Sequence, residues 1–302
     1  MDISAWVLMS VLLKLGIYLC ACVAIGAPFI RYLVLTQALD KERQLEYSIS
    51  RYYGRLIFLG ATFSVFNFYV QVGAFAEQGV SGMFNADLAV MLWQSAVGDM
   101  MLFQLSGFLV IGVSQSVGQI SVSQGLSFNS RYVSAVLFLT GLTLLALSFS
   151  MVGHTLEHGF MARIILSMHL LVVAWWIGTL FPLKSACRFL NVDSIFQLME
   201  IFGKIASYIV AILVICGVTL VIVIADFKLD IFYQVYGWLL LAKLTLVAGM
   251  LMVALYHKLK LVPSLKEESG AALKLEKSIS REILLAMMIL LFTALLTLVV
   301  SP

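Results

Sequence analysis

Three of the four histidines in this chain lie within a short stretch of its sequence. His154 and His158 lie four residues apart, and His169 follows in an apolar run. An imidazole in or beside a membrane-type apolar run is commonly a metal ligand, a proton carrier or a polar bridge. The spacing therefore predicts one site that uses His154 and His169, with His158 near enough to contribute.

Methionines accompany these histidines and indicate which metal they would bind. Met151 lies three residues before His154, so the two share a face if the helix before them continues, and Met161 precedes His169. A mixture of thioether and imidazole donors suits Cu(I) better than a hard cation. The alternative is that both methionines only fill space, because the chain holds 14 of them and apolar helices use methionine for packing.

Three charged side chains, those of Lys14, Asp99 and Lys243, lie inside apolar runs. Each costs about 2.5–3.5 kcal/mol at the centre of a membrane helix, so each is expected to face other helices and to have a partner. Asp99 and Lys243 lie at similar predicted depths and are predicted to pair. Such a pair serves either structure or transport, and both interpretations stay open.

The composition identifies the kind of chain that must position these residues. Of its 302 residues, 62% are hydrophobic and only 12% are charged, against about 25% charged in a soluble domain. The mean hydropathy of +1.04 leaves no polar part for a separate soluble domain, so residues 1–302 are predicted to form one integral-membrane domain in a lipid bilayer. The net charge of +3, without a basic cluster, excludes nucleic acid as a partner.

Apolar runs of about 20 residues predict an all-α polytopic membrane protein, a bundle of about eight transmembrane helices. The predicted helices span residues 6–30, 53–75, 88–113, 132–152, 162–184, 202–224, 232–256 and 279–300. On this assignment His169 lies about 10 Å below the start of its helix. The two longest connections, 31–52 and 257–278, are charged and are predicted to be loops.

Lysine and arginine fall almost entirely in alternate connections. One set of connections holds 14 of them and the other set holds two, Arg163 and Lys228. Because cytoplasmic loops of membrane proteins retain these residues, both termini are predicted to be periplasmic. The predicted copper ligands then lie toward the periplasm, whereas His257 lies at the cytoplasmic end of its helix and is interpreted as an interfacial residue.

Three segments resemble the CopD (copper resistance protein D) family of bacterial inner-membrane proteins. The first combines Gly153-His154 with the run from His169 to Gly178, which reads His-Leu-Leu-Val-Val-Ala-Trp-Trp-Ile-Gly. The second is Tyr236-Gly237-Trp238-Leu239-Leu240-Leu241-Ala242-Lys243, continuing to Pro263, and the third runs from Leu275 to Glu282. The similarity covers residues 130–302 well and the first half by hydropathy and helix count alone.

The resemblance implies a multi-pass protein of the bacterial inner (cytoplasmic) membrane that takes up copper from the periplasm. It also implies a separate periplasmic copper carrier of the CopC type as a partner. Carried over by position, His154 and His169 are candidates for the metal site, whereas Trp176, Lys243 and Glu282 are pattern residues without an assigned role. His257 stands where the family pattern has asparagine.

Two further functions remain open beside that of a copper permease without enzymatic turnover. Imidazoles on facing membrane helices can hold haem b, as in a cytochrome-b-type membrane oxidoreductase, although His154 and His169 differ in depth. The second is an interaction protein that keeps the fold and has lost its metal. The chain has no Gly-rich nucleotide-binding loop, so copper movement is expected to be downhill or coupled to an ion gradient.

Overall fold

The computed structural model describes residues 5–37, 42–123, 128–151, 159–225, 235–268 and 270–299. These residues are almost entirely helical, and the described part of the chain contains no strand. The helices of the first half are α1 (Ala5–Thr36), α2 (Glu42–Ala76), η1 (Gly79–Phe84), α3 (Ala86–Trp93), α4 (Ala96–Ser123) and α5 (Phe128–Ser148). Those of the second half are α6 (Gly159–Phe189), α7 (Val192–Ala225), α8 (Val235–Tyr256), the π turn η4 (His257–Leu261), α9 (Val262–Ser264) and α10 (Ala271–Val299).

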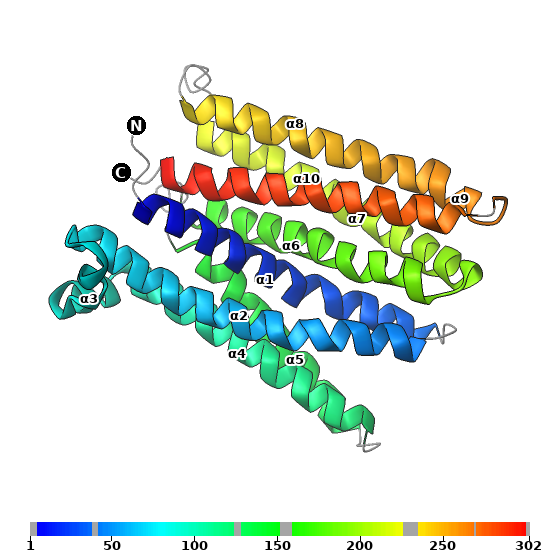
Figure 1. Cartoon of the computed structure of the whole chain (residues 1–302), viewed down its shortest axis with the longest axis horizontal. Coiled ribbons are helices and arrows are strands. Elements are labelled where there is room, and N and C mark those ends of the chain that lie inside the picture. The colour runs from blue at the N-terminus through cyan, green and yellow to red at the C-terminus, as the bar shows by residue number, and fades with distance from the viewer. Residues whose placement is uncertain are drawn as a thin grey trace.

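Eight of these helices are long and apolar enough to cross a membrane, which confirms the predicted helix count. They are α1, α2, α4, α5, α6, α7, the stretch from α8 through α9, and α10. They run side by side along the long axis of the molecule (Figure 1). The described residues therefore form a polytopic helical bundle, as the sequence predicts.

The prediction of loops at residues 31–52 and 257–278 is wrong, because most residues of each stretch are helical. α1 continues to Thr36 and α2 already begins at Glu42, and α10 begins at Ala271. Lysine, arginine and glutamate are good helix formers, so a helix does not end where its sequence becomes polar. Hydropathy marks the part of a helix that lies in lipid, and these helices extend beyond it.

The predicted helix 88–113 is divided in two at Gln94 and Ser95. The hydroxyl of Ser95 accepts a hydrogen bond from the backbone N–H of Val97 at 3.2 Å, which caps the start of α4. Asp99 consequently lies in the first turn of α4, where a negative charge is favoured by the helix dipole. The depth assigned to Asp99 from the sequence was therefore too large.

α1 is the central helix of the bundle and packs against α2, α6 and α10. Its closest approach is to α6, where Gly26 faces Gly178. A Cβ atom on Gly178 would overlap the backbone carbonyl of Cys22, and a Cβ on Gly26 would overlap the backbone at Gly178. Small residues permit such close backbone contact between membrane helices. Cys22 is buried at this contact, whereas Cys20, which is also buried, faces Gly60 of α2.

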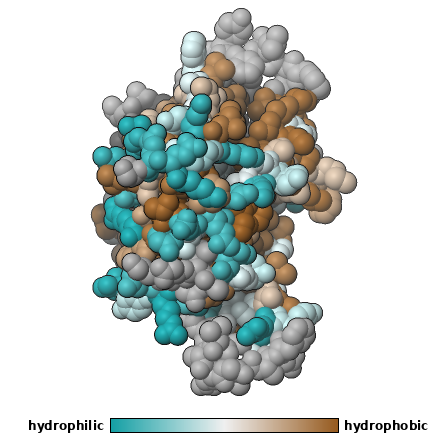
Figure 2. All heavy atoms as spheres, turned by 90° about the vertical axis from the view of Figure 1, so that its right-hand side faces the viewer, coloured by the Kyte–Doolittle hydropathy of each residue, from teal (hydrophilic) through white to brown (hydrophobic). Residues whose placement is uncertain are grey.

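The two ends of the bundle differ in polarity. α1 begins and α10 ends at one end, which we call the N-terminal face (Figure 1, left). The opposite end, which we call the basic face, carries the described lysines and arginines of the first set of connections, and hydrophilic side chains cover much of it in Figure 2. Two ion pairs join helix ends there, Arg31–Glu46 at 2.7 Å and Arg188–Glu276 at 2.6 Å.

Candidate functional site

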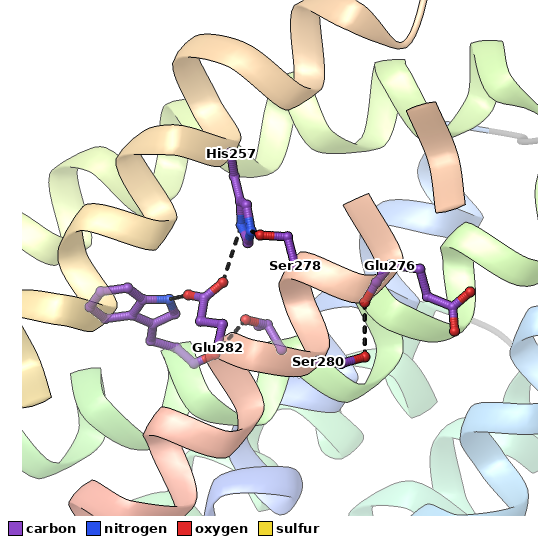
Figure 3. A network of polar contacts seen from close by, with 7 residues as sticks. His257, Glu276, Ser278, Ser280 and Glu282 are labelled. Atoms are coloured by element: carbon purple, nitrogen blue, oxygen red, sulfur yellow. Dashed lines mark hydrogen bonds and ion pairs between the residues drawn. The ribbon is translucent and has the colours of Figure 1, made fainter. Parts of the chain in front are cut away.

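A buried polar cluster joins three helices in the half of the bundle nearer the basic face (Figure 3). α10 supplies Ser278 and Glu282, which are four residues apart and therefore share one face of the helix. η4 supplies His257 and α6 supplies Trp176. We call these four residues the His–Glu cluster.

Glu282 is at the centre of the His–Glu cluster and is only 2% exposed. The indole N–H of Trp176 donates a hydrogen bond to Glu282 Oε1 at 3.1 Å. Nδ1 of His257 lies 3.2 Å from Glu282 Oε2, and Nε2 of His257 lies 2.7 Å from the hydroxyl of Ser278. Both carboxylate oxygens and both imidazole nitrogens are thus engaged within the cluster.

The π turn places His257 in this position. The backbone N–H of Val262 bonds to the carbonyl of His257, five residues back, and Pro263 follows without an N–H of its own. Single π turns inside α-helices are rare and are frequent at functional sites. His257, which the sequence analysis interprets as an interfacial residue, has a side chain that is only 13% exposed and contacts the buried carboxylate of Glu282.

His169, the predicted metal ligand, lies on α6 and faces α7. A Cβ atom on Gly217 would be 3.3 Å from its Cε1 atom, so the ring packs against the backbone of α7. Its Nδ1 atom is buried and has no hydrogen-bond partner among the described residues. The backbone of Leu213 on α7 lies near the ring without meeting hydrogen-bond geometry at Nδ1, and the charge of Lys243 on α8 acts on His169.

His154 and His158 lie outside the described residues, in the connection between α5 and α6. α6 already begins at Gly159, so His169 is about 15 Å along the helix rather than the predicted 10 Å. Met161 is 70% exposed on the first turn of α6, and Met151 is partly buried just after α5. Among the described residues no three His, Cys, Asp or Glu side chains lie together as a metal-binding group.

Asp99 and Lys243 do not pair, contrary to the prediction. α4 packs against α1, α2, α3 and α5, whereas α8 packs against α10 and η4 on the far side of the bundle (Figure 1). The Asp99 side chain is exposed. Two residues at similar depth can lie on helices that do not touch. Depth alone is therefore not enough to predict that two charged residues pair. Lys14 does have a partner, the hydroxyl of Thr297 on α10, at 3.4 Å.

The described histidines bear on the haem alternative. Both nitrogens of His257 have partners within the His–Glu cluster, so an iron could bind its Nε2 atom only by displacing the Ser278 hydroxyl. Among the described residues this leaves His169 as the histidine with a free buried nitrogen. A bis-histidine haem would need its second ligand from residues beyond those described.

The eight apolar helices and their buried ionisable side chains define a multi-pass α-helical membrane protein with a polar centre inside the bundle. Residues 196–296, about a third of the chain, match the family model CopD, copper resistance protein D. No curated protein and no solved structure matches the chain.

The matched region runs from α7 to α10 and contains three of the four residues of the His–Glu cluster, His257, Ser278 and Glu282. His169 and the connection that holds His154 and His158 precede it.

Proposed function

We propose that this protein is a copper-binding permease of the bacterial inner membrane that accepts copper from the periplasm and carries out no enzymatic reaction. His169 is the proposed ligand inside the bundle. His154, His158, Met151 and Met161 are proposed to receive the metal at the N-terminal face and pass it to His169. A periplasmic carrier of the CopC type is the proposed donor.

The observation that carries this proposal is the buried Nδ1 atom of His169, which has no hydrogen-bond partner among the described residues. Leaving a buried polar atom unpaired costs about 1–3 kcal/mol, so such an atom in a membrane helix calls for a ligand. The lone pair of a neutral imidazole is a good donor to copper, and thioethers nearby favour Cu(I). The match of residues 196–296 to the family model CopD, copper resistance protein D, supports copper as the metal.

The positive charge of Lys243 is expected to weaken copper binding at His169. An ammonium group beside His169 opposes the binding of a cation, and α8 carries Lys243 on the same side of the bundle. Replacing Lys243 with methionine, which has a similar length and no charge, is therefore expected to tighten copper binding at His169. Weaker binding in Lys243→Met would show that the lysine supports the site instead.

The proposal is tested by titrating the purified full-length protein with Cu(I) against a chromophoric Cu(I) chelator. We expect the His154→Ala/His169→Ala variant to bind less copper per protein, and His257→Asn to bind as much as the wild type, because His257 belongs to the His–Glu cluster and is not one of the proposed copper ligands. Copper affinity should fall as the pH falls, since only a neutral imidazole binds a metal.

Two results would contradict the copper site. Unchanged copper stoichiometry in the double variant would reject His154 and His169 as ligands. A Soret band in the purified wild-type protein, lost in the double variant, would support haem binding instead.

A further inference from the structure

The His–Glu cluster contains a buried carboxylate whose contacts include one group able to carry a positive charge. Glu282 is 2% exposed and lies within a candidate membrane span, as do His257 and Trp176. Trp176 donates a neutral hydrogen bond, so His257 is the group that can balance the charge of Glu282. An ionisable side chain inside a membrane span is costly and commonly belongs to an ion or proton pathway.

The neighbouring charges on the surrounding elements are engaged elsewhere. On η4, Lys258 donates to Ser207 of α7 at 2.6 Å. Arg188, at the end of α6, pairs with Glu276 of α10 at 2.6 Å, and Lys274 of α10 pairs with Glu268 at 2.6 Å.

The remaining charged groups nearby lie on the surface or at other depths. The side chains of Lys260, Lys277 and Arg281 are exposed. On α1, Lys14 contacts Thr297, near the opposite end of α10. With Glu282 ionised, protonation of His257 takes the His–Glu cluster from one negative charge to neutral, counting the described residues.

The hydroxyl of Ser278 allows His257 to change its protonation state without losing a hydrogen bond. In the neutral ring, Nδ1–H donates to Glu282 and Nε2 accepts from the Ser278 hydroxyl. When a proton from water binds the Nε2 lone pair, the new N–H donates to the same Ser278 oxygen. The hydroxyl proton can then turn toward the carbonyl four residues earlier in α10, a common acceptor for serine in helices.

We propose that His257, Ser278 and Glu282 form a proton-binding site inside the membrane and that this site couples copper movement to a proton. His257 takes up the proton at Nε2, and the Glu282 carboxylate is the fixed counter-charge. The partly exposed His257 side chain gives the site access to water from the basic face. The coupling rests on the proposed copper permease, whereas proton binding does not.

Proton binding is measured by NMR of the full-length protein, labelled with ¹⁵N-histidine and held in lipid nanodiscs. As the pH is lowered over the range that the folded protein tolerates, the proposal predicts that Nε2 of His257 changes from unprotonated to protonated while Nδ1 stays protonated. The resonance is assigned by its loss in His257→Asn. Ser278→Ala, which removes one hydroxyl and perturbs the same resonance, gives a second assignment if His257→Asn does not fold.

The Glu282→Gln variant separates a proton site from a merely structural hydrogen bond. Glutamine keeps an oxygen that can accept from His257 but removes the negative charge, so Nε2 should stay unprotonated over the same pH range. A wild-type His257 that keeps one protonation state throughout would overturn the proposal. So would a Glu282→Gln variant that titrates like the wild type.

Coupling is measured in proteoliposomes that contain a trapped pH indicator, with Cu(I) added outside. In the wild type we expect a change of internal pH that accompanies copper entry, and in His257→Asn copper entry without that change. Copper entry without a pH change in the wild type would reject the coupling. Absence of copper entry in the wild type would instead reject the permease and leave the NMR result to decide on proton binding.

Discussion

Glu282 shows how the bundle accommodates a carboxylate that its sequence places in an apolar helix. Glu282 is one of the pattern residues in the segment from Leu275 to Glu282, but its partners could not be predicted from the sequence. Trp176 is 106 positions away in the chain, and His257 comes from a third element. The one local signal is the spacing of Ser278 and Glu282, which puts two polar groups on one face of α10. The spacing could not be used, because the sequence predicts a loop at 257–278. That prediction puts Ser278 outside the helix and Glu282 near the membrane surface.

Replacing Glu282 with alanine is expected to destabilise the protein strongly. The substitution leaves the buried N–H groups of Trp176 and His257 without acceptors, at a cost of roughly 1–3 kcal/mol for each. Thermal unfolding in detergent, followed by circular dichroism, should therefore show a lower Tm.

Glu268→Ala is the matched control for this prediction. Glu268 and Lys274 form an exposed ion pair, so removing it should change stability by no more than about 1 kcal/mol. Equal Tm values for Glu268→Ala and Glu282→Ala would contradict the structural role assigned to the buried carboxylate.

At the scale of helices, hydropathy predicts which segments cross the membrane and leaves their ends and neighbours undetermined. The eight spans could be found because each holds a long apolar run. The break at Ser95 could not, because the apolar run continues through it and a single capping hydroxyl decides the boundary. The neighbours of a helix depend on details such as Gly178, where the absence of a side chain brings α6 against α1.

Gly178→Ala is expected to weaken the contact between α1 and α6. The added methyl group would overlap the backbone carbonyl of Cys22, which cannot move without shifting the central helix. We expect a lower yield of folded protein in size-exclusion chromatography and a lower Tm.

Gly203→Ala and Gly249→Ala are the controls, because a Cβ at either glycine meets no atom within 4 Å. Alanine is the better helix former by about 1 kcal/mol, so both variants should be as stable as the wild type or slightly more stable. If Gly178→Ala were equally well tolerated, the close contact of α1 with α6 would be in doubt.

The whole molecule has one strongly basic face and one face with few basic residues. That asymmetry was predictable, because it depends on the order of charged and apolar segments. The predicted position of the copper ligands near the N-terminal face follows from the same order. The route of copper from that face toward the His–Glu cluster depends instead on side chains of α6, α8 and α10, which come from distant parts of the sequence. Membrane orientation decides whether His169 or the His–Glu cluster lies nearer the periplasm.

Both termini are expected to lie in the periplasm, with the basic face in the cytoplasm. Two exposed positions test this, Glu267 in the turn before α10 and Phe84 at the end of η1 on the opposite side. In intact cells, an impermeant thiol reagent that reaches the periplasm should label Phe84→Cys and leave Glu267→Cys unlabelled. The unsubstituted chain is the control for its four cysteines. Labelling of Glu267→Cys alone would invert the topology.

Copper transport by the purified full-length protein tests the central claim most directly. Liposomes containing the protein would be given Cu(I), and the copper inside them would be measured over time against protein-free liposomes. We expect saturable accumulation in the wild type that is lost in His169→Ala and retained in Glu268→Ala. Accumulation no faster than in protein-free liposomes, or accumulation unaffected by His169→Ala, would contradict a copper permease that works through His169.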